Sequence, residues 1–277
     1  MTAGPVAVVT GGGSGIGLAT CTRLAKDGFT VAALDLQPSG ATGIAALVIV
    51  GDVTDEADVS TAMATVTDRF GGIDVLVNNA GITGSRQAAR CHETPVEEWD
   101  RVQAVNVRGP FLCSRAVLPS MVARGSGHII MIASVAGLIA FPGRCAYTAS
   151  KGAALMLTRS IAVDYAAAGI RANAVCPGMV YTPMTSWRLD QPELRAAVED
   201  RIPVGRVAAP EEIADAVAVL ASGRLGYMTG HPLIVDGRNL LDPVATQAAG
   251  FVYEGMGRPR HASPAPRQAA PGAELRA

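Results

Sequence analysis

The sequence predicts an α/β fold: a single doubly wound, Rossmann-type domain whose mostly parallel, seven-stranded sheet carries helices on both faces. Two observations predict it. Short runs of apolar, β-branched residues alternate with longer stretches of helical periodicity, and the first run leads through a glycine-rich turn directly into a helix. Continuously apolar strands that alternate with helices are typical of parallel sheets buried on both faces. Ligands in such folds bind beyond the carboxyl ends of the strands, so functional residues are expected there.

The predicted elements follow one another along almost the whole chain. Strands are expected at residues 6–10, 30–34, 47–50, 73–77, 128–133, 171–176 and 232–235. Helices are expected at residues 15–27, 55–70, 96–105, 107–124, 146–167 and 210–221. The segment 37–46 leaves room for one helical turn or none. These elements make up a catalytic domain over residues 1–240 with a substrate lid over about 179–206, and residues 241–277 form a C-terminal extension whose end is expected to be flexible.

Composition and charge exclude several classes of protein. The 277 residues are 49% hydrophobic with a formal net charge of −1, and they contain neither a basic stripe for nucleic acid nor a charge block for a membrane surface. No apolar run approaches the roughly 20 residues that span a bilayer. No secretion signal is recognisable at the N-terminus, so a cytoplasmic location is expected. The five cysteines are widely spaced and fit neither a disulfide framework nor a metal site.

The glycine-rich turn after the first strand predicts a dinucleotide site. It reads Thr10-Gly-Gly-Gly-Ser-Gly-Ile-Gly17 and opens a helix. Glycines let the backbone approach a pyrophosphate, and the helix N-terminus offers N–H groups and a positive dipole to the anion. Asp35 follows at the end of the second strand, where a carboxylate binds a ribose diol and repels a 2′-phosphate. No basic residue lies in the turn or directly after Asp35, so NAD is the expected cofactor.

Tyr147 and Lys151 lie four residues apart on a predicted helix and therefore share a face. A tyrosine with its ordinary pKa of about 10 is a poor base at neutral pH, and a nearby ammonium lowers that pKa. Ser134 ends the fifth strand, where its hydroxyl can hold a substrate oxygen beside Tyr147. Asn106 interrupts a helical stretch, where its amide can bind water or backbone. This placement predicts Tyr147 as the proton-transfer residue.

Taken together, these motifs resemble those of the short-chain dehydrogenases/reductases. The resemblance covers roughly residues 4–240 and rests on the glycine turn, Asp52-Val53, Asn78-Asn-Ala-Gly81, Asn106, Ser134, Tyr147-Thr-Ala-Ser-Lys151 and Pro177-Gly178. It implies a catalytic tetrad of Asn106, Ser134, Tyr147 and Lys151. In that tetrad Tyr147 exchanges a proton with the substrate oxygen and Ser134 polarises it. Lys151 binds the nicotinamide ribose, and Asn106 supports a water relay.

The resemblance also implies a cofactor site and an assembly. The cofactor-binding residues would be Gly11, Ser14, Gly15, Ile16, Gly17, Asp35, Asp52, Val53, Asn79, Ala80, Gly81, Tyr147, Lys151, Pro177, Gly178, Val180 and Thr182. Resembling proteins are commonly homotetramers, so a homotetramer or homodimer is expected. No metal is implied.

Residues of the lid and of the segment around Ser134 are expected to form the substrate pocket. The candidates are Ser134, Ala136, Leu138, Arg144, Tyr147, Met179, Met184 and Trp187. They are mostly apolar, which suits a carbon-rich secondary alcohol or ketone. Arg86, Arg144 and Arg188 are candidates for binding a carboxylate, although such arginines are more often solvated surface charges.

Three functions stay open at this point. The leading interpretation is NAD-dependent interconversion of a secondary alcohol and a ketone. An NADPH-dependent ketoreductase of the 3-oxoacyl-carrier-protein reductase type is the main alternative. A non-catalytic dinucleotide-binding protein is disfavoured, because Ser134, Tyr147 and Lys151 are all present.

Overall fold

A central sheet organises the part of the chain that the computed structural model describes, residues 4–87 and 89–237. Its strand order is β3-β2-β1-β4-β5-β6-β7, and all six pairings between neighbours are parallel. The strands are β1 Val6–Thr10, β2 Thr30–Asp35, β3 Leu47–Val50, β4 Val75–Asn78, β5 Gly127–Ile132, β6 Ile170–Pro177 and β7 Pro232–Val235. The predicted doubly wound fold is therefore confirmed. The predicted extension at 241–277 lies outside the described residues.

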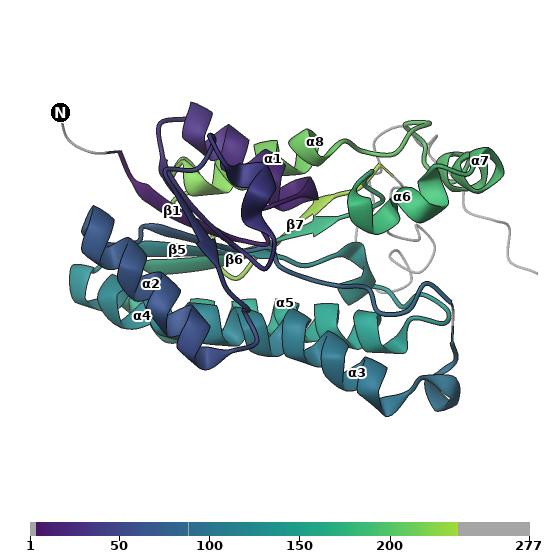
Figure 1. Cartoon of the computed structure of the whole chain (residues 1–277), viewed down its shortest axis with the longest axis horizontal. Coiled ribbons are helices and arrows are strands. Elements are labelled where there is room, and N and C mark those ends of the chain that lie inside the picture. The colour runs from purple at the N-terminus through teal and green to yellow at the C-terminus, as the bar shows by residue number, and fades with distance from the viewer. Residues whose placement is uncertain (1–3, 88, 238–277) are drawn as a thin grey trace, which may run out of the picture. The chain divides into compact units, whose positions relative to one another are not determined.

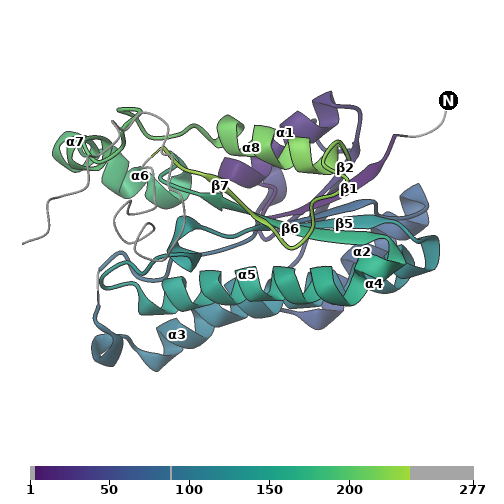
Figure 2. The same ribbon diagram turned by 180° about the vertical axis from the view of Figure 1, so that it is seen from behind.

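Helices cover both faces of the sheet (Figures 1 and 2). On one face lie α1 and α8, and on the other lie α2, α4 and α5, with α3 beside α5. Two further short helices, α6 and α7, follow β6. The helices are α1 Gly15–Lys26, α2 Glu56–Phe70, α3 Val96–Gln103, α4 Gly109–Arg124, α5 Cys145–Tyr165, α6 Pro183–Leu189, α7 Pro192–Glu199 and α8 Pro210–Ala221.

Strand alternation produces one core on each face of the sheet. Along β1, Val6 and Val8 enter the cluster packed against α2, α4 and α5, whereas Ala7 and Val9 enter the cluster packed against α1 and α8. All of β1 is buried, because successive side chains point to opposite faces and both faces are covered. The strands are thereby fixed with their carboxyl ends at one edge, which is where the site forms.

Local signals set the helix boundaries. The carboxylate of Asp55 accepts the backbone N–H groups of Ala57 and Asp58, which caps α2, and Gly71 ends α2 with a φ of 84°. Between α3 and α4 the chain forms a π-helical turn over Ala104–Arg108. The sequence predicted an interruption at Asn106, and the structure shows that the helix widens there instead of ending. The short segment after β2 contains one 3₁₀ turn, Pro38–Ala41, as its length predicted.

Candidate active site

The glycine turn lies between β1 and α1, and close backbone packing requires its glycines. Gly11 has a φ of 63°, and its N–H donates to the Leu34 carbonyl at 2.8 Å. A Cβ on Gly17 would lie 2.0 Å from the Gly11 carbonyl oxygen, so α1 can start this close to the turn only with glycine there. The first turn of α1 contains no acidic residue, and the side chain of Ser14 makes no capping hydrogen bond. These features fit a pyrophosphate at this helix N-terminus.

Two side chains lock the turn against β4. Asn79 donates from Nδ2 to the carbonyl oxygens of Thr10 and Gly11, each at 3.0 Å. The Thr10 hydroxyl oxygen accepts the N–H groups of Asn79 and Ala80 at 3.0 and 3.1 Å. Sequence reasoning placed Asn79 among the cofactor ligands, and the structure shows that its amide holds the phosphate-binding turn in shape.

One carboxylate lies on the last residue of β2 and a second lies two residues after β3. Asp35 accepts the Gly13 N–H at 2.8 Å and the Gln37 N–H at 2.9 Å, one on each oxygen. Asp52 accepts the Thr54 N–H at 2.8 Å. Each carboxylate oxygen can accept more than one hydrogen bond, so the fixed Asp35 carboxylate can still receive a ribose hydroxyl. Its negative charge disfavours a 2′-phosphate at the same place.

Ser134, Tyr147 and Lys151 meet beyond the carboxyl end of β5. Ser134 is the first residue of a turn after that strand, and its hydroxyl oxygen accepts the Ala136 N–H at 3.1 Å. It also shares a hydrogen bond with Tyr147, which lies in the first turn of α5. Lys151 follows one turn later and is 6% exposed. Its Nζ donates to the Ile132 carbonyl at 2.8 Å and lies 5.8 Å from the Tyr147 ring centre.

Burial dominates the proton affinities of this group. Burial raises the pKa of Tyr147, and the hydrogen bond with Ser134 partly opposes that rise. Burial lowers the pKa of Lys151 from 10.5 to about 8. On balance the pKa of Tyr147 is raised, whereas a net lowering was expected from the nearby ammonium, because desolvation of the phenolate dominates and only the Ser134 hydrogen bond opposes it. The protein alone holds Tyr147 protonated at neutral pH.

Asn106 lies behind these residues, in the π-helical turn, and is 1% exposed. Its Oδ1 accepts the Ile82 N–H at 2.9 Å, and its Nδ2 donates to the Ile82 carbonyl at 2.8 Å and to the Ser150 hydroxyl at 2.9 Å. A Cβ built on Gly81 would lie 3.3 Å from Asn106 Oδ1 and 3.5 Å from Lys151 Nζ. The amide thus ties the segment after β4 to the π-helical turn, and glycine leaves space between Asn106 and Lys151.

One cavity of about 920 Å³ joins these groups. Most of the predicted site residues line it: Gly11, Ser14, Gly15, Ile16, Asp35, Asp52, Val53, Asn79, Ala80, Gly81, Ser134, Arg144, Tyr147, Lys151, Pro177, Gly178, Met179, Val180, Thr182, Met184 and Trp187. Gly17 and Asn106 do not line it and lie behind its wall.

Two predicted substrate residues, Ala136 and Leu138, do not line the cavity. Ala136 is 1% exposed, and Leu138 packs against the buried cluster that contains Leu155. The reason is the single 3₁₀ turn Val135–Gly137, which has about three residues per turn and rotates the side chains after Ser134. Val135, Phe141 and Pro142 line the cavity in their place. Arg86, a candidate for a carboxylate, does not line it, whereas Arg144 and Arg188 do.

The predicted lid contains α6 and α7 and has a small core of its own, formed by Leu189, Val198, Ile202 and Val207. Its two ends meet side by side: the Tyr181 N–H donates to the Ala208 carbonyl, and the Ala208 N–H donates to the Met179 carbonyl, both at 2.9 Å. The lid is therefore a closed loop with a fixed base. At that base, a Cβ on Gly15 would lie 3.4 Å from Thr182, so the lid begins against the phosphate-binding turn.

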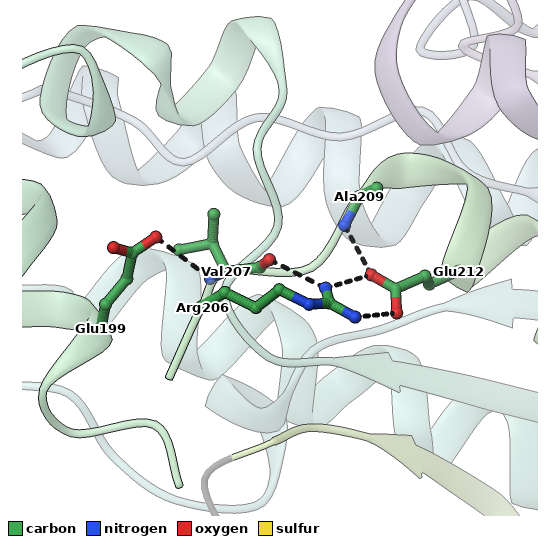
Figure 3. A network of polar contacts seen from close by, with 5 residues as sticks. All are labelled: Glu199, Arg206, Val207, Ala209 and Glu212. Carbon is green, nitrogen blue, oxygen red and sulfur yellow. Dashed lines mark hydrogen bonds and ion pairs between the residues drawn. The ribbon is translucent and has the colours of Figure 1, made fainter. Parts of the chain in front are cut away.

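An ion pair anchors the second end of the lid to α8 (Figure 3). Arg206 binds both carboxylate oxygens of Glu212, at 2.7 and 2.8 Å, and Glu212 also accepts the Ala209 N–H at 2.9 Å. On the lid side, Glu199 accepts the Val207 N–H at 3.4 Å. The hydrogen bonds from Arg206 lower the pKa of Glu212 to about 2, so this carboxylate stays ionised at neutral pH.

Sequence reasoning missed two charged residues of the cavity wall, Arg101 on α3 and Arg201 after α7. No local pattern distinguishes them from surface arginines, because each faces the cavity only through the packing of its helix. Among the described residues no cluster of three or more His, Cys, Asp or Glu side chains could hold a metal ion. Nor does any helix in this part of the chain have the length and apolar character needed to cross a membrane.

Comparison with known proteins connects this geometry to a family. A protein-family model described as Enoyl-(Acyl carrier protein) reductase matches residues 11–237. The chain is similar to 2-(R)-hydroxypropyl-CoM dehydrogenase of Xanthobacter autotrophicus, at 55% identity over 84% of this chain and 97% of the relative. It is also similar to cis-4-hydroxycyclohexanecarboxylate dehydrogenase of Sinomonas cyclohexanicum, at 42% identity over 84% of this chain and 95% of the relative.

The fold has close counterparts among solved structures. The 3-ketoacyl-(acyl-carrier-protein) reductase from Brucella melitensis, complexed with NADH, aligns with a TM-score of 0.80 at 34% identity. The alignment covers 87% of this chain and 100% of that one. The chain belongs to the short-chain dehydrogenase/reductase family, as an oxidoreductase that interconverts a CH–OH group and a carbonyl group.

Proposed function

We propose that this oxidoreductase uses NAD to interconvert a secondary alcohol and its ketone, with Tyr147 as the proton-transfer residue. One observation carries the proposal: Ser134, Tyr147 and Lys151 line the same cavity as the glycine turn and Asp35. A hydride acceptor held by the turn and a proton acceptor on α5 can therefore reach one substrate carbon and its oxygen. The names of both relatives contain a hydroxylated substrate, which agrees with this reaction.

In the proposed reaction the polypeptide handles the proton. In the direction of reduction, Tyr147 donates its phenolic proton to the ketone oxygen; in the direction of oxidation, the phenolate removes the hydroxyl proton. The Ser134 hydroxyl donates a hydrogen bond to the same oxygen and stabilises the charge that develops there. When bound, NAD supplies the hydride acceptor and NADH the hydride donor.

Lys151 and Asn106 support Tyr147 in this proposal. Lys151 is held by the Ile132 carbonyl, and its remaining donors are available to a ribose hydroxyl. Its ammonium lies 5.8 Å from the Tyr147 ring centre, and a positive charge there has the sign that favours the phenolate. Asn106 fixes the backbone of Ile82 behind the site, where the predicted water relay would pass.

The choice of NAD over NADP rests on Asp35. Its carboxylate is fixed by the N–H groups of Gly13 and Gln37 and lines the cavity. Leu36, the next residue, is 64% exposed and carries no charge that could receive a 2′-phosphate. NADH is the cofactor described for the Brucella melitensis reductase, which is consistent with this choice.

Assembly and location remain predictions. We propose a homotetramer or homodimer, for which the exposed side chains of Phe111 on α4 and of Met156 and Val163 on α5 offer an apolar surface. A cytoplasmic location remains the expectation from the sequence.

A screen of secondary alcohols with NAD, read by NADH absorbance, tests the proposed function. We expect turnover of at least one alcohol, and we expect Tyr147→Phe to lower kcat by about 10³-fold while the Kd for NAD stays within about threefold. Full activity of Tyr147→Phe would remove Tyr147 from the mechanism. A large preference for NADPH, with ketone reduction favoured, would instead support the 3-oxoacyl-carrier-protein reductase alternative.

A further inference from the structure

A chain of hydrogen bonds behind the cavity connects the segment after β4 to the first turn of α5. Asn106 donates from Nδ2 to the Ser150 hydroxyl at 2.9 Å, and the Ser150 hydroxyl donates to the Tyr147 carbonyl oxygen at 2.7 Å. At the other end of the chain, the Asn106 amide binds both the N–H and the carbonyl of Ile82. Ser150 therefore joins the π-helical turn to the residue that is proposed to transfer the proton.

The direction of these bonds leaves the Asn106 amide one orientation. A hydroxyl has a single proton, and that of Ser150 goes to the Tyr147 carbonyl, which can only accept. The Ser150 oxygen must therefore accept, and only the NH₂ end of the Asn106 amide can donate to it. This orientation turns Asn106 Oδ1 toward the Ile82 N–H, which it accepts at 2.9 Å. The Ser150 hydroxyl thus decides which end of the amide faces Ile82.

Burial makes this chain of bonds sensitive to the loss of one member. Ser150 is 0% exposed and Asn106 is 1% exposed. A buried NH₂ group that loses its acceptor has no bulk water to replace it, so the amide and the backbone that carries it are expected to move. That backbone is the π-helical turn Ala104–Arg108, a rare form of helix that is frequent at functional sites.

Two neighbouring residues of α5 set the two sides of the space beside Gly81. A Cβ on Gly81 would lie 3.3 Å from Asn106 Oδ1 and 3.5 Å from Lys151 Nζ. Lys151 is held on its side by a backbone carbonyl of β5, and Ser150, the preceding residue, holds Asn106 on the other. Movement of Asn106 would therefore change the surroundings of the Lys151 ammonium.

We propose that Ser150 is a positioning residue of the reaction, which fixes the Asn106 amide and thereby holds the π-helical turn in place beside Tyr147 and Lys151. This proposal deepens the proposed function and rests on it for the effect on turnover. Ser150 does not line the cavity, so it acts only through Asn106 and the backbone of Tyr147. Its loss should slow the chemical step and leave the binding of substrate and cofactor almost unchanged.

Ser150→Ala tests this role. We expect kcat for a secondary alcohol to fall by about tenfold or more, whereas its KM and the Kd for NAD stay within about twofold. Thr158→Val is the matched control, because the Thr158 hydroxyl is also buried on α5 and donates to a backbone carbonyl, that of Ala154 at 2.9 Å. The control should keep the wild-type kcat. A wild-type kcat in Ser150→Ala, or an equal loss of kcat in both variants, would overturn the proposal.

A double-mutant cycle tests whether Ser150 acts through Asn106. Asn106→Ala by itself should lower kcat, and the addition of Ser150→Ala should lower it by less than about twofold more. Ser150→Thr keeps the hydroxyl and should restore most of the kcat that Ser150→Ala loses. Multiplicative losses in the cycle, or a kcat of Ser150→Thr no higher than that of Ser150→Ala, would contradict the proposal.

Hydrogen exchange separates failure of this inference from failure of the proposed function, because it needs no turnover. Mass spectrometry would follow the backbone amides of Ile82 and of the π-helical turn in wild type, Ser150→Ala and Thr158→Val. We expect these amides to exchange at least about tenfold faster in Ser150→Ala only. Unchanged exchange would overturn the proposal even if the enzyme oxidised alcohols. Faster exchange in a protein that turned over no alcohol would support the positioning by Ser150 and contradict the proposed function.

Discussion

The cofactor half and the substrate half of the cavity are built in different ways. In the cofactor half, backbone groups and short side chains at strand ends are fixed by one another, as when Asn79 and Thr10 clamp the glycine turn. In the substrate half, long side chains extend from the lid, whose own core is four residues with Met179 packed against it. Cofactor geometry is therefore set by close backbone contacts that tolerate little change, whereas substrate choice depends on side chains that can be exchanged.

The largest effect is expected from Gly17→Ala, in the cofactor half. The new Cβ would lie 2.0 Å from the Gly11 carbonyl oxygen, so the turn and the start of α1 must move apart. We expect the Kd for NAD, measured by calorimetry, to rise by about 100-fold. Gly226→Ala is the control, because its Cβ would meet an ordinary contact of 3.5 Å. A Kd within threefold of wild type would show that the turn and the start of α1 can accommodate a Cβ at this position.

A smaller effect is expected from Asp35→Asn, which removes the charge and also replaces one of the two oxygens that accept the Gly13 and Gln37 N–H groups by an amide nitrogen. The preference for NAD over NADP, as a ratio of kcat/KM values, should fall by about tenfold or more because the repulsion of a 2′-phosphate is lost. Asp68→Asn on the exposed side of α2 provides the matched control. An unchanged ratio would mean that another residue selects the cofactor.

Lys151, where the two halves meet, predicts a pH dependence of stability. Its pKa is about 8 in the folded protein and about 10.5 when unfolded, so the unfolded chain binds more protons between these values and stability rises with pH through this window. The difference in free energy of unfolding between wild type and Lys151→Met should increase by about 1.5 kcal/mol from pH 8 to pH 9.5. Urea unfolding of both proteins measures it. Parallel pH profiles would show that Lys151 keeps its ordinary pKa.

The smallest effect is expected from Arg206→Gln at the base of the lid (Figure 3). The ion pair with Glu212 is exposed, with side chains 53% and 42% accessible, so its loss should loosen the lid only modestly. We expect the KM for the alcohol to rise about two- to fivefold, with the Kd for NAD unchanged. Arg224→Gln, in the segment that follows the C-terminal end of α8, is the control. A change in NAD binding as large as that in KM would mean that lid and turn move together.

The elements that could be predicted were those whose signal is local. The ranges of β1, β3, α8 and β7 agree with the sequence prediction at both ends, because caps, glycines and apolar runs define them. The break at Asn106 was also visible, but its form was not: a π-helical turn leaves no distinct residue pattern and depends on Ile82 and Ser150 reaching the same amide. Ala136 and Leu138 were misplaced, since one 3₁₀ turn after Ser134 decides which side chains face the cavity.

By itself, the sequence determined the fold class, the glycine turn, the acid at the end of the second strand and the placement of Ser134, Tyr147 and Lys151 near one another, because parallel strands bring their carboxyl ends to one edge. Only the tertiary structure decided the proton affinities and the charge of the substrate end. Burial raises the pKa of Tyr147 and lowers that of Lys151, and burial depends on neighbours distant in sequence. Arg101 and Arg201 likewise face the cavity only because the packing of α3 and of the lid turns them toward it.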